Sequence, residues 1–120
     1  MTASKIVLGA ASSAGGGDPL YVENVFSTFL YEGNGSTRSI TNGIDLSGEG
    51  GLVWIKIRDG YHSPSGHHLY DTERGATKKL RSDNTDSEDT VSTGLTAFNS
   101  NGFSLGSSGG VNGSGTGDSY

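Results

Sequence analysis

The clearest pattern in the chain is a regular alternation of side-chain types between residues 51 and 59. In a strand, successive side chains point to opposite faces, so every second residue shares a face. One face is apolar throughout and carries Val53, Ile55 and Ile57. The other face begins apolar and ends cationic, and it carries Leu52, Trp54, Lys56 and Arg58. The pattern predicts a strand with one face in the core and the other half covered.

Shorter apolar runs between turn residues predict further strands. They cover residues 6–8, 21–33, 39–46, 68–72 and 76–81, followed by a hairpin of 95–100 and 103–107. Asn101-Gly102 is the expected hairpin turn, because this dipeptide tolerates positive φ. A helix also fits the spacing over 22–30, but Val, Phe, Thr and Tyr favour a strand. Roughly six to eight short strands, with no helix needed, predict an all-β fold, an antiparallel sandwich or jelly roll.

Composition divides the chain into three parts. Glycine makes up 21 of the 120 residues, more than twice its usual share of ~7%, and only 31% of residues are hydrophobic. We therefore expect a flexible, extended N-terminal arm over 1–20, one β-rich domain over 21–106, and a Gly/Ser-rich segment over 107–120 that leads to sequence beyond Tyr120. A net charge of −5 argues against a nucleic-acid partner. No run is long enough for membrane insertion, and there is no cysteine for a disulfide.

The arm is the first candidate contact surface. Its apolar stretch is short for a secretion signal, so we interpret it as part of the mature protein. An apolar patch on a glycine-hinged arm is expected to dock on its own domain or on a neighbour. The candidate partner contacts are Ile6, Val7 and Leu8 on the arm, with Tyr21, Phe26 and Phe29 after it.

Titratable clusters offer weak signals for chemistry. His62, His67 and His68 could suggest a metal site, but adjacent histidines in a strand point to opposite faces, and we expect surface histidines. Asp71 and Glu73 would share a strand face and could act on a glycoside, although pairing of one with Arg74 or Lys56 is favoured. The acidic run 83–89 lacks the EF-hand pattern, so we expect a solvated loop and not a Ca²⁺ site.

Trp54 is the candidate for glycan binding, because Tyr61 and Tyr70 are near in sequence and could form a stacking platform with it. The alternative is a core or interface tryptophan. The chain carries no nucleophile elbow, no phosphate-binding loop and no HExxH motif. We predict no catalytic residues, no cofactor and no metal, and expect that the protein is not an enzyme.

Several motifs together resemble a domain in virion proteins of marine phages, many of them cyanophages. The motifs are GLVWIK at 51–56, DTERGATKKL at 71–80, an Asn/Thr/Asp-rich loop at 82–90, and FNSNGFSLGS at 98–107. The resemblance covers about residues 40–120. The combination of these motifs is far more specific than any one of them. The loop at 61–68 is local to this chain, so its histidines inherit no role.

The resemblance implies a structural component of the virion tail: the N-terminal part of a tail fibre or tail appendage that attaches to the tail and supports host attachment. The implied partners are other tail proteins, such as the tail body, an adaptor or the nozzle. A homotrimer is expected, with any host surface glycan bound by more distal parts. The alternatives are a capsid decoration protein, a carbohydrate-binding adhesin module that uses Trp54, and a polysaccharide depolymerase.

Overall fold

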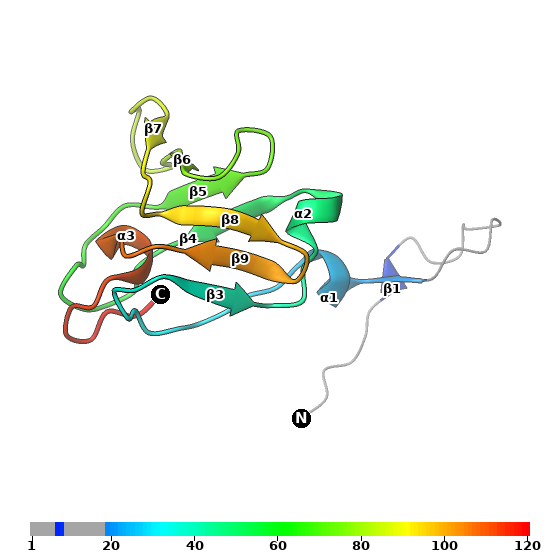
Figure 1. Ribbon diagram of the computed structural model, residues 1–120, viewed down its shortest axis with the longest axis horizontal. Helices are drawn as coiled ribbons and strands as arrows, with labels where there is room; N and C mark the ends of the chain where they lie inside the picture. The colour runs from blue at the N-terminus through cyan, green and yellow to red at the C-terminus, as the bar shows by residue number, and fades with distance from the viewer. Residues whose placement is uncertain (1–6, 9–18) are drawn as a thin grey trace.

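The computed structural model describes residues 7–8 and 19–120, and it confirms the predicted all-β fold (Figure 1). The strands are β1 (Val7–Leu8), β2 (Leu20–Tyr21), β3 (Arg38–Thr41), β4 (Leu52–Ile55), β5 (His68–Asp71), β6 (Lys78–Lys79), β7 (Asp89–Thr90), β8 (Leu95–Asn99) and β9 (Gly102–Leu105). Three one-turn helices accompany them: α1 (Val22–Val25), α2 (Leu46–Glu49) and α3 (Gly109–Asn112). Every strand pair is antiparallel.

Two layers enclose the core. One is the sheet β3-β9-β8, and the other is the pair β4-β5. The predicted alternation in β4 is confirmed, since Val53, Ile55 and Ile57 are buried while Leu52 and Trp54 are exposed. These side chains pack in one cluster with residues of the facing sheet, which are Ile40, Leu95, Phe103 and Leu105. The arrangement is a small antiparallel sandwich.

The predicted strand over 21–33 is wrong. Residues Val22–Val25 form α1, which is followed by an extended stretch in which only Glu32 and its neighbours find a backbone partner. The Asn24 side chain accepts a hydrogen bond from the Tyr21 N–H at 3.1 Å, which favours a turn at this point. A strand propensity is realised only where a partner edge is available. The segment is therefore a helical turn followed by an extended wall of the domain.

The predicted strand over 39–46 is shorter than expected. β3 ends at Thr41, and Asp45 then caps α2 by accepting a hydrogen bond from the Gly48 N–H at 2.8 Å. An aspartate at this position satisfies a backbone donor that the first helical turn leaves free. The last residue of the predicted strand, Leu46, is instead a buried helical residue.

The predicted hairpin of β8 and β9 is confirmed, with its turn one residue earlier than expected. Asn99 pairs with Gly102, so the two-residue loop is Ser100-Asn101. Gly102 has φ +153°, and a Cβ there would lie 1.9 Å from the Ile40 carbonyl oxygen. The glycine is needed at the first residue of β9, where the backbone of β3 approaches closely, and not in the turn.

The Gly/Ser-rich segment 107–120, set apart from the domain on composition, packs into the sandwich. Val111, Asn112, Asp118 and Tyr120 are all buried. The Asn112 side chain donates to the Ser36 and Gly106 carbonyls at 2.7 and 2.9 Å and accepts from the Asn34 N–H at 3.0 Å. The packing of residues therefore shows no boundary at residue 106.

Candidate functional site

An apolar groove separates β4 from the extended stretch 26–31. It encloses 1190 Å³ and is lined on both walls by large exposed side chains. These are Phe29 (44% exposed), Leu30 (69%), Leu52 (56%) and Trp54 (60%). Val53, Ile55 and Phe103 also line it, so the groove reaches the edge of the core. Contiguous apolar surface of this kind marks an interaction site.

Stacked tyrosines close one end of the groove. The rings of Tyr31 and Tyr120 lie 5.1 Å apart and 15° from parallel. The Tyr31 hydroxyl donates to the Val111 carbonyl at 2.6 Å, and the Tyr120 hydroxyl donates to the Gly109 carbonyl at 2.6 Å. Burial raises the pKa of both hydroxyls above its usual value, so both remain neutral donors. This end of the groove is fixed by bonds to α3 and its flanks.

The other end of the groove meets an N-terminal projection, which we define as Leu20–Phe26. Figure 1 shows α1 and β1 beyond one end of the sandwich, away from the C-terminus. Helix α1 has no buried residue, and Leu20, Val25 and Phe26 are 47%, 51% and 65% exposed. The projection therefore presents apolar side chains that the described part of the chain does not cover.

The predicted partner contacts fall in different places. Tyr21 and Phe26 belong to the N-terminal projection, and Phe29 lies on the groove wall. Val7 and Leu8 pair by their backbones with Tyr21 and Leu20. Ile6 lies outside the described residues. The structure thus brings the contact candidates after residue 20 to one end and one wall of the domain.

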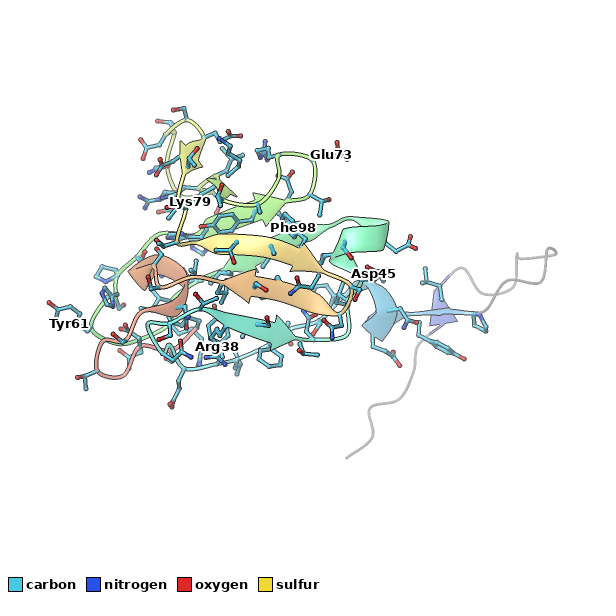
Figure 2. All side chains as sticks on the ribbon, in the orientation of Figure 1. Arg38, Asp45, Tyr61, Glu73, Lys79 and Phe98 are labelled. Carbon is cyan, nitrogen blue, oxygen red and sulfur yellow. The ribbon has the colours of Figure 1, made fainter. Side chains whose placement is uncertain are left out.

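Trp54 does not form a three-ring platform with Tyr61 and Tyr70, the arrangement considered for glycan binding, and at 60% exposed it is not a core residue either. Tyr70 is fully buried, and Figure 2 shows Tyr61 at the end of the domain away from the N-terminal projection. The Trp54 indole N–H donates to His67 Nδ1 at 2.9 Å, and the two rings meet edge to face with centroids 5.5 Å apart. Trp54 is thus an exposed single ring held in place by one histidine.

The prediction that the histidines lie at the surface is wrong for His68, which is only 6% exposed. A Cβ on Gly110 would lie 2.2 Å from its Cε1, so the imidazole is buried where α3 offers a glycine. Burial, with the nearby cations Lys79 and Arg81, lowers the pKa of His68 to about 4. His62 is bonded through Nδ1 to Oδ2 of the buried Asp118 at 2.5 Å. Both histidines have structural partners.

The carboxylates of the two predicted acidic clusters are paired with cations or lie in loops. Asp71 forms an ion pair with Arg74 at 2.8 Å, as the non-catalytic alternative predicted, and Glu73 lies in the loop after β5 (Figure 2). In the acidic run, Asp83 pairs with Arg81 at 2.7 Å, which lowers the pKa of that carboxyl. No group of three metal-ligating side chains occurs within residues 7–8 and 19–120. In the same ranges no helix is long and apolar enough to cross a membrane.

One protein-family model matches nearly the whole of the described sandwich. A family model described as a domain of unknown function (DUF7483) matches residues 22–119. The chain belongs to the DUF7483 family. No curated protein and no solved structure matches it. The DUF7483 match includes both sandwich layers, both walls of the groove and the Gly/Ser-rich segment through residue 119, whereas β1 and β2 precede it.

Proposed function

We propose that the protein is a structural component of a bacteriophage tail, the N-terminal part of a tail fibre or tail appendage. In this proposal the N-terminal projection attaches it to another tail protein. The observation that carries the proposal is the N-terminal projection, where Leu20, Val25 and Phe26 present apolar side chains that the described residues leave largely exposed. One helical turn with no buried side chain gains little stability of its own, because helix nucleation is unfavourable and tertiary packing supplies most helical stability.

The energy available to this contact is substantial. Fully burying an apolar side chain contributes about 1.5–3 kcal/mol. Leu20, Val25 and Phe26 are each about half exposed or more, so covering them together would contribute roughly 2–5 kcal/mol. In a symmetric fibre each copy of the chain would contribute this free energy. The resemblance to marine-phage proteins favours three copies, a trimer.

The same resemblance to virion proteins suggests the class of partner, which is another tail protein. It implies no catalytic residues for this chain. The surface chemistry is compatible with protein docking: the chain has a net charge of −5 and its uncovered projection is apolar. Within residues 71–89 the carboxylates are engaged in ion pairs or lie in exposed loops. These observations favour an assembly module over a hydrolase.

Location is tested by immunogold labelling of intact virions with an antibody raised against residues 21–107. Gold at the tail is expected. Gold over the head would favour the capsid-decoration alternative. Particles that remain unlabelled and contain none of the protein by mass spectrometry would refute the virion assignment.

Docking is tested with phage that carry Leu20→Ser and Phe26→Ser together. Quantitative mass spectrometry should find the protein reduced at least about tenfold per particle, as expected from a loss of more than ~1.4 kcal/mol of contact energy. Tyr61→Ser is the matched control, because Tyr61 is 77% exposed and lies at the other end of the domain. Equal incorporation of the wild type, the double variant and Tyr61→Ser would contradict docking through the projection.

One observation favours a second function, a carbohydrate-binding adhesin module. Trp54 is 60% exposed and its ring is oriented by His67, and an exposed aromatic face can stack on a sugar. The protein has one tryptophan, so its fluorescence reports on this ring alone. A shift of this fluorescence on adding host surface glycan is the expected result for an adhesin. An unchanged spectrum across a panel of host glycans would exclude it.

A further inference from the structure

The outer face of the β4-β5 pair carries a row of apolar side chains. Trp54 of β4 lies opposite Leu69 of β5, and Leu69 in turn bridges Leu80, which follows β6. Directly paired residues of antiparallel strands share a face, so the three side chains form one row, which we call the outer row. Their neighbours Val53 and Tyr70 are buried in the core. The outer row therefore points away from the core.

Polar side chains with planar groups border the outer row on one side. His67 accepts the Trp54 indole N–H at Nδ1, so the proton of the neutral imidazole is on Nε2, which remains a donor. The His67 N–H donates to Asp83 Oδ1 at 3.0 Å. Arg81 donates to both oxygens of Asp83, at 3.3 and 2.7 Å. An imidazole, a carboxylate and a guanidinium thus meet beside the row.

A second ion pair borders the outer row on its other side. Asp71 lies opposite Leu52 and shares its outward face. The Asp71 carboxylate pairs with Arg74 at 2.8 Å. All four side chains of the two ion pairs are partly exposed. Exposed ion pairs contribute little to stability, so these groups can share their hydrogen bonds with a ligand at small cost.

The outer row is distinct from the groove, which lies at the other edge of β4. Trp54 belongs to both surfaces, whereas Leu80 does not line the groove. At the closed end of the groove, Ser119 bridges Glu32 on one wall and Asp59, after β4, on the other. Ser119 is thus inserted between the two walls. Substitutions in the outer row and on the far groove wall therefore separate the two surfaces in an experiment.

The outer row and its border have the chemistry of a sugar site. The ring of a hexose presents C–H groups that pack on the face of an exposed indole, and its hydroxyls both donate and accept hydrogen bonds. A carboxylate only accepts and a guanidinium only donates, so the two ion pairs offer both kinds of partner beside an apolar surface. Sites for small ligands share this combination of an apolar lining with a few placed polar groups.

The cations around the outer row already have partners. Each arginine is matched by an aspartate, at 2.7 or 2.8 Å. Lys56 donates to the Ile57 and Ser65 carbonyls at 2.8 and 2.7 Å. Lys78 donates to the Thr90 hydroxyl at 2.8 Å. Hydroxyl groups can join these bonds, whereas a carboxylate or sulfate would have to displace them. The surroundings therefore favour an uncharged sugar.

We propose that the outer row binds a neutral sugar unit of a polysaccharide, with its ring on Trp54 and its hydroxyls on Arg81 and Asp83. His67 is the positioning residue that orients the indole. This assignment rests on the adhesin candidate, whose ligand class and contacts it names, and it does not depend on how the protein attaches to a tail.

Binding is measured by isothermal titration calorimetry of the full chain with neutral hexasaccharides of glucose, mannose and galactose, and with hexagalacturonic acid. At least one neutral hexasaccharide should bind, and the acid should bind at least about tenfold more weakly. Arg81→Gln and Leu80→Ser should each weaken binding of the neutral sugar at least about tenfold. Leu30→Ser, on the far groove wall, is the matched control and should bind like the wild type.

The outcomes separate this site from the adhesin candidate as a whole. Weakened binding by Leu30→Ser with unchanged binding by Arg81→Gln and Leu80→Ser would place the sugar in the groove and overturn the assignment alone. A preference for hexagalacturonic acid would overturn the neutral class. No binding of any of the saccharides would overturn both the site and the adhesin candidate. Trp54 emission reports that each variant is folded, and Arg81→Gln changes only a partly exposed side chain.

Discussion

Mild acid should destabilise the domain through His68. The side chain is buried against Gly110, with its Nε2 3.2 Å from the Ser65 hydroxyl. Burial is the main cause of its lowered pKa, and the cations Lys79, Arg81 and Lys56 add to it, while Asp83 opposes it. Its pKa is about 4 in the folded protein, against an ordinary value of 6.5. Between these two values the unfolded chain binds more protons than the folded one.

The sign and size of the effect follow by linkage. The folded pKa is depressed, so the contribution to the free energy of unfolding is fully present above pH ~6.5 and is lost as pH falls toward ~4. One pKa unit corresponds to about 1.4 kcal/mol, which gives a loss of about 2 kcal/mol by pH 5 and about 3 kcal/mol by pH 4. A domain of this size has roughly 5–15 kcal/mol in total.

Urea unfolding at a series of pH values, followed by circular dichroism, measures this loss. His68→Gln is the control, because glutamine does not titrate. It should be less stable than the wild type at pH 7 but should show a much flatter dependence between pH 6.5 and 4.5. The lowered pKa of Asp118 acts in both proteins and only at more acidic pH. Parallel pH profiles for the two proteins would refute the assignment of the acid effect to His68.

Four substitutions test the packing directly, each by urea unfolding at pH 7. Asn112→Ala removes a fully buried amide and leaves the Gly106 carbonyl without its partner, so a loss of about 3 kcal/mol is expected; a loss below ~1 kcal/mol would contradict this role. Gly102→Ala should cost more than about 3 kcal/mol, since the new Cβ meets the β3 backbone, whereas Gly43→Ala, at φ +84° with open space around it, should cost only about 1 kcal/mol. Tyr120→Phe loses hydrogen bonds to Gly109 and Gly113 but keeps its ring stack, so about 1–2 kcal/mol is expected, and a neutral result would show that these bonds are replaced by water.

The sequence predicted the parts of the fold that depend on local pattern. The alternation around Val53 identified the face of β4 that enters the core, and the hairpin of β8 and β9 followed from its turn residues. It also placed the apolar Leu52 and Trp54 on the mixed face of β4, which was a usable signal for the exposed wall of the groove. Each of these properties is encoded within about ten consecutive residues.

The remaining features depend on contacts between distant segments, which no local pattern reports. His68 is buried because a glycine of α3 allows close approach. The stretch 21–33 has strand-forming residues but only a short partner, since residues 118–120 reach it at one end alone. Gly/Ser-rich composition concealed the structural roles of Asn112 and Tyr120. The groove arises from where residues 118–120 insert, so its position was not predictable from sequence.

The insertion of residues 118–120 between two earlier segments also determines when the domain can fold. The Tyr31 hydroxyl bonds to a residue 80 positions later, and His62 bonds to one 56 positions later. A ribosome releases the chain from its N-terminus, so β4 and the stretch 31–33 emerge well before the segment that joins them. Non-local pairing of this kind slows folding and prolongs the exposure of apolar surface. Newly made chains would therefore pass through an aggregation-prone period, during which contact with a chaperone would improve the yield of folded protein.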